Sequence, residues 1–380
     1  MTINPVLFAS EIKRQHYRYQ VTAFPLSDPD LSAQAKKMLS GEHSLGSELL
    51  KGPYISLSRP FAEGSILGDL VQEGRLHPGV AHIAEHPRMF AHQQEVFDAV
   101  MEGRHCLVST GTGSGKTESF LYPIIDHCFK LKDEQIPPGI VAVIVYPMNA
   151  LAIDQLERLR KLLAGTGITF GMYVGSTKRR NADVVGVKRM QEGEGRDALR
   201  HYYDHQNNRE NITVIPHEEK ISVEEMHEEP PRILLTNINQ LEYLLTRPSD
   251  LKMIENSLLK YLVFDEAHTY TGSRGAEVAL LIRRLRAFAG KSADDVICIG
   301  TSATIVDPRG RVAAGAKFFN RFFGVDTGSV SFVEEKYIDT IYPDHPARTK
   351  PIGIAAPRFL QYTFDAIEDS GNPDKISGIL

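Results

Sequence analysis

Short apolar runs alternate with amphipathic stretches along the middle of the chain. Six of the runs are rich in aliphatic residues and end at polar or turn residues, a pattern typical of strands that are buried on both faces. They read HCLVS (105–109), IVAVIVYP (140–147), ITFGMYV (168–174), RILLT (232–236), KYLVFDE (260–266) and DVICIGTS (295–302). The stretches between them have helical spacing, so the pattern predicts an α/β fold with a parallel sheet flanked by helices. Ligands of such folds bind beyond the carboxyl ends of the strands, so the residues after each run are the candidates for chemistry.

The composition is that of a globular protein without a membrane segment. The 380 residues are 42% hydrophobic and 24% charged, with a formal net charge of −5. This balance allows a sizeable core but lacks the basic excess of many nucleic-acid binders. The chain has no apolar run of about 18 residues and no signal-peptide pattern, which favours a cytoplasmic location. Cys106, Cys128 and Cys298 are expected to be buried small side chains. The spacing of His82, His86 and His92 suits neither a zinc site nor a catalytic pair.

The loop VSTGTGSGKTE (108–118) lies between the first apolar run and a helical stretch. Its glycines let backbone N–H groups approach phosphate oxygens, and the following helix adds the positive end of its dipole. Lys116 is expected to reach the β- and γ-phosphates of a nucleotide, and the Thr117 hydroxyl is expected to bind Mg²⁺. Thr110 stands where the strict phosphate-loop pattern has glycine. The expected phosphate cradle consists of Thr110, Gly111, Thr112, Gly113, Ser114, Gly115, Lys116 and Thr117.

The last two apolar runs each end in polar residues. The first of them ends in two carboxylates, and the second ends in a hydroxyl-rich segment. Asp265 and Glu266 follow the strand KYLVF within the tetrapeptide DEAH. A carboxylate at this position can hold Mg²⁺, and its neighbour can orient the attacking water. The next run ends in the tripeptide SAT, which contains Ser302 and Thr304. The sequence therefore predicts Glu266, Lys116 and Asp265 as catalytic residues, with Thr117 and Asp265 as the magnesium ligands.

The glycine-rich loop, DEAH and SAT, in this order and each after a strand, resemble motifs I, II and III of the superfamily 2 helicases and nucleic-acid translocases. The resemblance implies a RecA-like P-loop NTPase domain that uses ATP and Mg²⁺. It also implies that His268, Ser302 and Thr304 relay the state of the γ-phosphate to the nucleic-acid site. Gln93 matches the glutamine with which the family reads the adenine edge, and Phe90 is its possible ring neighbour.

Three further segments resemble the strand-binding motifs of the same family. YPMNALA, from Tyr146, resembles motif Ia, MYVGST (172–177) resembles motif Ib, and ILLTN, from Ile233, resembles the next strand-binding loop. The expected nucleic-acid contacts are Pro147, Asn149, Ala150, Gly175, Ser176, Thr236 and Asn237. Each of these segments is also compatible with an ordinary turn after a strand.

Other stretches resemble one branch of the superfamily. DEAHTYTGSRGAEVALLIRRL, YPMNALA and EEPPRILLTNINQLEYLLTRP are similar to sequences of the branch with the mitomycin-repair helicase and the very large helicases of bacterial anti-phage systems of the Druantia type. The resemblance implies a DNA motor that moves 3′ to 5′ and serves anti-phage defence or DNA repair. Arg283, Arg284 and Arg286 in this region are expected on the solvent side of an amphipathic helix.

The chain is expected to have three parts. Residues 1–85 form an N-terminal leader, residues 86–325 form the motor domain, and residues 326–380 form a linker toward a second RecA-like domain that this chain lacks. Within the motor domain, residues 178–231 are polar and highly charged. They are compatible with an ordered insertion, a flexible loop or a partner-binding element, and a partly ordered insertion near the nucleic-acid face is favoured. Its basic start, Lys178 to Arg180, could contact phosphates or form a solvated face.

A single motor half is expected to be a weak enzyme, because related motors sandwich ATP between two RecA-like domains and take arginines from the second. The expected partners are single-stranded or partly duplex nucleic acid, with DNA favoured, the second domain, and proteins of a defence system. Two rival hypotheses remain open at this stage. The protein could translocate on duplex DNA and serve a nuclease partner without unwinding, or it could be an ATP-gated nucleic-acid-binding module. RNA also remains a possible substrate, because contacts to phosphates do not identify the sugar.

Overall fold

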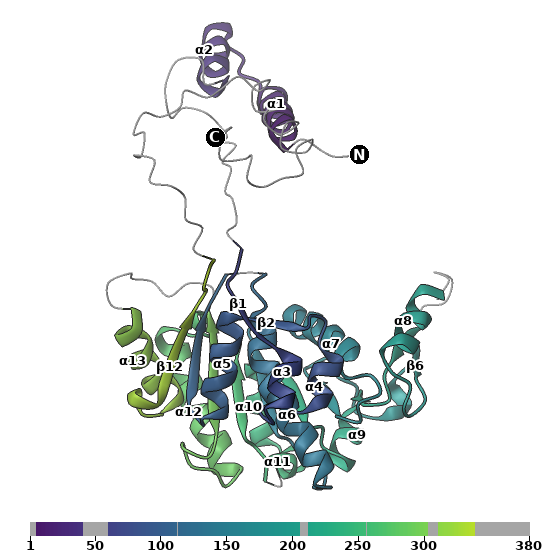
Figure 1. Cartoon of the computed structure of the whole chain (residues 1–380). Helices are drawn as coiled ribbons and strands as arrows, with labels where there is room; N and C mark the ends of the chain where they lie inside the picture. The colour runs from purple at the N-terminus through teal and green to yellow at the C-terminus, as the bar shows by residue number, and fades with distance from the viewer. Residues whose placement is uncertain are drawn as a thin grey trace. The chain divides into compact units, whose positions relative to one another are not determined.

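The computed structural model describes residues 5–40, 60–111, 113–205, 212–255, 257–302 and 311–338. The chain divides into two compact units, of which the larger spans Arg59–Ile338 and the other combines Met1–Ser58 with Asp339–Leu380. In the other unit the structure describes two helices, α1 (Pro5–Ala23) and α2 (Pro29–Ser40). The candidate chemistry lies in the larger unit (Figure 1).

An eight-stranded sheet forms the centre of the larger unit, with the strand order β12-β3-β11-β10-β4-β9-β5-β8. All its strand pairings are parallel. The strands are β3 (His105–Ser109), β4 (Ala142–Tyr146), β5 (Phe170–Tyr173), β8 (Glu219–Lys220), β9 (Ile233–Asn237), β10 (Tyr261–Phe264), β11 (Ile297–Ser302) and β12 (Val330–Glu334). Each of the six apolar runs supplies one of these strands, so the predicted parallel sheet is confirmed.

Helices cover both faces of the sheet (Figure 1). Alternate residues of one strand enter different clusters: Val108 of β3 packs with one set of helices and Leu107 with another. This alternation is the consequence of the two-residue repeat of a strand. The first face is covered by α3 (Leu67–Gln72), α4 (Pro78–Ile83), α5 (Ala91–Met101), α6 (Lys116–Asp133) and α7 (Asn149–Leu163). The second face is covered by α10 (Ile238–Thr246), α11 (Pro248–Glu255), α12 (Gly272–Phe288) and α13 (Arg311–Phe323).

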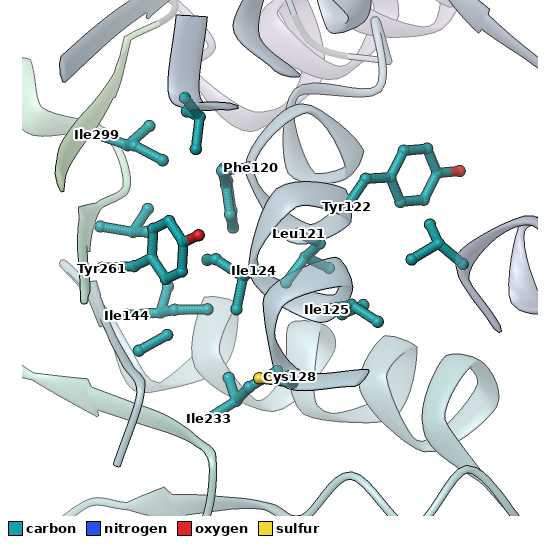
Figure 2. Close-up of a cluster of buried hydrophobic side chains, with 14 of the residues drawn as sticks. Phe120, Leu121, Tyr122, Ile124, Ile125, Cys128, Ile144, Ile233, Tyr261 and Ile299 are labelled. Carbon is teal, nitrogen blue, oxygen red and sulfur yellow. The ribbon is translucent and has the colours of Figure 1, made fainter. Parts of the chain in front are cut away.

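Helix α6, which follows the glycine-rich loop, is fixed to the sheet by its apolar face. Figure 2 shows Phe120 and Ile124 on the side of the helix that faces Ile144, Tyr261 and Ile299 from three different strands. All of these side chains are at least 96% buried within one cluster. The cluster therefore holds the start of α6, where Lys116 and Thr117 lie, in a fixed position relative to the strand ends.

The compact unit begins earlier in the sequence than the expected domain start at residue 86. Strands β1 (Glu63–Ile66) and β2 (Arg88–Phe90) form an antiparallel pair. Side chains from α3 and α4, including Leu70 and Val80, are buried in the same cluster as the sheet. Residues 60–85, which the sequence assigned to a leader, thus pack as part of the domain. At the other end, β12 lies inside the segment expected to be a linker.

The charged segment 178–231 contains ordered elements. These are η1 (Asn181–Asp183), β6 (Val187–Arg189), α8 (Arg196–His205), β7 (Thr213–Ile215), β8 and α9 (Val223–Glu228). β6 and β7 pair in a small separate sheet, and Met190, Leu199 and Val214 form a small apolar cluster with Ala164 at the end of α7. At its basic start, Arg180 is exposed and forms an ion pair with Asp183 at 3.2 Å.

Two short 3-10 helices complete the unit, η2 (Ala267–Thr269) and η3 (Thr327–Ser329). Cys106, Cys128 and Cys298 are buried, and burial raises the pKa of each thiol to about 12. Arg286 differs from its expected solvent-side position: it is 5% exposed, and its Nη2 donates to the carbonyl of Phe323 at 2.6 Å. Among the described helices, none is long and apolar enough to cross a membrane.

Candidate active site

The residues predicted to handle a nucleotide converge at the carboxyl ends of three neighbouring strands. Lys116 begins α6 after the loop that follows β3, Asp265 follows β10, and Ser302 ends β11. The strands lie side by side in the order β3-β11-β10. Gly113 and Gly115 have φ angles of 80° and 74°, which residues with a Cβ rarely adopt, so the loop depends on glycine at these positions. Thr112 lies outside the described residues.

A lysine and two adjacent carboxylates face each other at this edge. Lys116 Nζ lies 3.5 Å from Glu266 Oε1, and both side chains are largely buried. Glu266 has a φ of 48°, a left-handed conformation that is uncommon for a residue other than glycine. Asp265 is located between its own strand and β11, where its carboxylate accepts a hydrogen bond from Thr301. The three charged residues thus form one compact group.

Thr301 holds both acidic residues in place. Its hydroxyl donates to Asp265 Oδ1 and accepts the backbone N–H of Glu266 at 3.1 Å. The Thr301 side chain is fully buried, so water does not compete for these two hydrogen bonds. Burial raises the pKa of Asp265, and the hydrogen bond from Thr301 opposes this rise by favouring the carboxylate.

A second contact joins the DEAH segment to the end of β11. His268 Nδ1 lies 3.2 Å from Ser302 Oγ and also 3.2 Å from Glu266 Oε2. The imidazole therefore stands between the carboxylate expected to orient water and the strand that leads into the SAT segment. Thr304, the third residue expected to relay the phosphate state, lies outside the described residues.

Two side chains at the start of α5 form hydrogen bonds with carbonyl groups of the glycine-rich loop. Gln93 Nε2 donates to the carbonyl of Gly115 at 3.0 Å, and its Oε1 accepts the backbone N–H of Phe90 at 2.8 Å. His92 is fully buried and its Nε2 lies 2.8 Å from the carbonyl of Ser114. Ser114 Oγ in turn lies 2.9 Å from Thr110 Oγ1. The two hydrogen bonds of Gln93 use one amide N–H and one lone pair of its amide oxygen.

A cavity of about 900 Å³ opens beside this group. Its walls include Gln93, Lys116, Thr117, Asp265 and Glu266. A cavity of this size is within the range of small-molecule sites, and it combines backbone N–H groups, a lysine and two carboxylates. The arrangement has the donors to hold an anionic phosphate chain and the acceptors to hold a hard cation.

The residues expected to contact nucleic acid form a second group at the same sheet edge. Asn149 begins α7 after β4, and Asn237 ends β9, the neighbour of β4. Asn237 Nδ2 donates to Asn149 Oδ1 at 2.7 Å, and Asn237 Oδ1 accepts the backbone N–H of Gln240 at 2.8 Å, which caps α10. The two loops are thereby joined to each other.

The other members of this group differ in exposure. Asn149, Ala150, Gly175 and Ser176 are exposed, and Pro147 is partly exposed. Thr236 is fully buried, and its hydroxyl donates to the carbonyl of Tyr173 at 2.7 Å. This hydrogen bond fixes the loop from inside.

Several residues of the site were missed by sequence reasoning. They are Thr301, His92, the pair Glu118 and Arg158, and Glu335, whose carboxylate accepts the backbone N–H of Gly111. Thr301 directly precedes the SAT segment and Glu118 directly follows Thr117. Their positions next to predicted motifs could therefore have identified both as site residues. Glu335 lies far from the loop in sequence and carried no such signal.

The fold is that of the RecA-like domains of helicases. The family described as DEAD/DEAH box helicase matches residues 90–191 and 197–310, which is more than half of the chain. The chain belongs to this family. The glycine-rich loop, DEAH and β11 all lie within the matched residues.

Comparison with curated proteins identifies relatives of the branch suggested by the sequence. The chain is 29% identical over 353 residues to Druantia protein DruE of Escherichia coli, covering 73% of this chain and 18% of DruE. It is 28% identical over 296 residues to the ATP-dependent helicase Lhr-Core of Methanothermobacter thermautotrophicus, covering 72% of this chain and 29% of that protein. The chain thus spans less than a third of the length of these relatives. The predicted resemblance to the Druantia-type helicases is confirmed.

Solved structures of the helicase Mss116 show the same fold. The DEAD-box helicase Mss116 bound to single-stranded RNA and UDP-BeF matches with a TM-score of 0.52 at 21% identity, covering 72% of this chain and 46% of that chain. The DUF1998 helicase MrfA bound to DNA matches with a TM-score of 0.49 at 22% identity, covering 73% of this chain and 31% of that chain.

Proposed function

We propose that the chain is the ATP-binding half of a DNA helicase or translocase that serves anti-phage defence or DNA repair in the cytoplasm. The observation that supports this most strongly is the grouping of Lys116, Asp265 and Glu266 at adjacent strand ends beside a cavity of about 900 Å³. The DNA preference and the defence role rest on the similarity to the Druantia-type relatives.

The residues present fit Mg²⁺ and the phosphates of ATP. Asp265 is a partly buried carboxylate that lines the cavity, and Thr117 lines the same cavity. Oxygen donors of this kind are the ligands that Mg²⁺ prefers. We assign Thr117 and Asp265 to the cation and Lys116, with the loop N–H groups, to the phosphates. When bound, the cation would neutralise negative charge on the phosphate oxygens.

The remaining residues have orienting roles in this proposal. Glu266 positions the attacking water, while Thr301 fixes the backbone of Glu266 and the carboxylate of Asp265. Gln93 holds the loop through Gly115 and presents its remaining amide groups to adenine. His268 and Ser302 link the carboxylate of Glu266 to β11, so a change at the γ-phosphate reaches the strand end.

The nucleic-acid strand would lie across the joined loops that carry Asn149 and Asn237. Exposed backbone and small side chains at Ala150, Gly175 and Ser176 suit contacts to phosphates. In this proposal the segment 86–325 is the body of the motor domain, residues 60–85 and β12 pack with it in the same compact unit, and a second RecA-like domain of the full-length protein completes the ATP site. The 380-residue chain by itself then hydrolyses ATP slowly and does not separate strands, because an arginine finger contributes about 10³- to 10⁵-fold in related chemistry.

Strand displacement and translocation assays on the full-length protein distinguish the proposal from its rivals. A helicase separates a partly duplex DNA with a single-stranded tail in the presence of ATP. Translocation on duplex DNA without strand separation supports a motor that serves a partner. ATP-dependent binding without movement identifies a gated binding module and contradicts the proposal. Equal activity on RNA and DNA contradicts the DNA preference.

A further inference from the structure

Helix α7 carries both a residue of the expected strand site and a residue of the ATP cavity. Asn149 stands at its first turn and bonds Asn237. Arg158 stands on the same helix and lines the cavity beside Lys116. At a rise of about 1.5 Å per residue, the two positions are about 14 Å apart along one rigid element. A shift of α7 at the nucleic-acid loop therefore moves Arg158 relative to the phosphate loop.

The partner of Arg158 lies directly beside the expected phosphate residues. Arg158 Nη2 donates to Glu118 Oε1, and Glu118 is the third residue of α6, after Lys116 and Thr117. The side chains of Glu118 and Arg158 are 17% and 37% exposed. Glu118 Oε2 is buried and has no hydrogen-bond partner within the described part of the chain. This oxygen lies 3.3 Å from the point where a Cβ on Gly115 would stand.

The position of Glu118 makes its charge relevant to ATP. A carboxylate that lies against the phosphate loop repels the phosphates of a nucleotide, and the repulsion is strong because the site is partly shielded from water. Arg158 neutralises this charge while α7 holds its present position. If α7 moves away, Glu118 is left unpaired next to the phosphate site, and ATP binding weakens.

We propose that the pair Arg158 and Glu118 couples nucleic-acid binding to ATP binding. A nucleic-acid strand bound to the loops of Asn149 and Asn237 fixes the position of α7. Arg158 then stays paired with Glu118, which favours ATP binding at the phosphate loop. Arg158 does not contact ATP in this scheme. It is a positioning residue that acts by holding and neutralising the carboxylate of Glu118. The inference rests on the proposed function, because it requires that α7 contacts a strand and that the cavity binds ATP.

The coupling is reciprocal and can be measured as a binding ratio. Two sites coupled in this way typically change each other's affinity by about 5- to 150-fold. The affinity of the full-length protein for a non-hydrolysable ATP analogue is measured without and with a saturating single-stranded DNA oligonucleotide. The ratio of the two affinities is the coupling factor. A variant whose fold is generally weakened loses affinity in both conditions and keeps this ratio.

We expect the coupling factor to fall from about 5- to 150-fold in the wild type to about 1 in Arg158→Gln and in Glu118→Gln. The double variant should show the same factor as either single variant, because both changes remove one interaction. Arg158→Lys should retain part of the coupling, because it keeps the charge. Lys161→Gln is the matched control: Lys161 is on α7 and lines the same cavity, so losing its charge should leave the coupling factor near that of the wild type.

The outcomes separate this inference from the proposed function. If DNA and RNA both leave the analogue affinity of the wild-type protein unchanged, the proposed function itself fails. If DNA strengthens analogue binding equally in the wild type and in the two glutamine variants, the proposed function stands and the coupling role is wrong. Equal loss of coupling in Lys161→Gln would also overturn it, since the effect would then be one of general cavity charge.

Discussion

Lys116 Nζ lies 3.5 Å from Glu266 Oε1, so the lysine of the phosphate loop is paired with the carboxylate of the DEAH segment. The two residues are remote in sequence and meet because β3 and β10 are both neighbours of β11. The lysine that is expected to hold phosphates thus has an internal counter-ion. Binding of ATP must replace this pairing, which places Glu266 under the direct influence of the γ-phosphate.

Glu266→Gln should separate nucleotide binding from turnover. The substitution keeps the side-chain size and removes the charge that pairs with Lys116, so ATP affinity should be retained or should increase. Turnover of the full-length protein should fall by at least about 100-fold, because the group that orients water is lost. Equilibrium ATP binding and steady-state ATPase rates measure the two effects. Retained turnover would remove Glu266 from the proposed role.

Thr301→Val should impair the site by releasing both carboxylates. Valine has nearly the same shape but cannot donate to Asp265 or accept from Glu266, and a hydrogen bond to a charged group contributes about 1.5–3 kcal/mol. Turnover should therefore fall on the order of ten- to hundredfold, whereas Thr301→Ser, which keeps the hydroxyl, should retain most of it. Similar rates for the valine and serine variants would contradict this role.

The pH profile of Thr301→Val gives an independent test. Burial raises the pKa of Asp265 and the Thr301 hydroxyl opposes that rise. Loss of the hydroxyl should raise the pKa further. Because the cation requires the ionised carboxylate, activity is lost as pH falls through this pKa, and the acid limb of the ATPase profile should move to higher pH in the variant. An acid limb at the wild-type position would show that Thr301 does not act on Asp265.

Asn237→Ala should weaken nucleic-acid binding beyond its effect on stability. The variant loses the cap of α10 and the bridge to Asn149; the lost cap costs about 0.5–2 kcal/mol of stability. Affinity for single-stranded DNA should fall by about two- to tenfold, the value of one hydrogen bond. Ser222→Ala is the matched control, because Ser222 caps α9 in the same way and should lower stability without this loss of affinity.

His92 should make the stability of the domain pH-dependent. Its ring is fully buried against Ser114, and burial lowers its pKa. The unfolded chain therefore binds a proton near pH 6.5 that the folded chain does not, and the free energy of unfolding should fall as the pH drops below about 6.5. His92→Gln should make the dependence shallower by up to about 1.4 kcal/mol per pH unit. Urea unfolding from pH 7.5 to 5 measures it; an unchanged slope would contradict the assignment.

The strands and the position of the motifs were predictable because they depend on local pattern. A run such as IVAVIVYP is short, apolar and rich in β-branched residues, which is typical of a strand covered on both faces. Parallel strands then place all their carboxyl ends at one edge, so Lys116 and Asp265 were expected at the same edge. β12 was missed because VSFVE carries polar residues and lies at the sheet edge, with partly exposed side chains.

The contacts that orient the site were not predictable, because they join elements that are distant in sequence. Thr301 reaches Asp265 across 36 positions and Arg158 reaches Glu118 across 40. Thr236 was expected at the tip of a strand-binding loop, but the fold buries it and uses its hydroxyl to fix that loop. The contact of Gln93 with the phosphate loop was likewise not predicted: its side-chain amide donates a hydrogen bond to the carbonyl of Gly115.

The most direct test is the ATPase rate of the full-length protein with and without single-stranded DNA, beside Lys116→Ala. Single-stranded DNA should stimulate the wild-type protein strongly. Turnover should be lost in Lys116→Ala, because the lysine that holds the phosphates is absent. Turnover that does not respond to any nucleic acid, or that survives the loss of Lys116, would contradict the proposed ATP-driven motor.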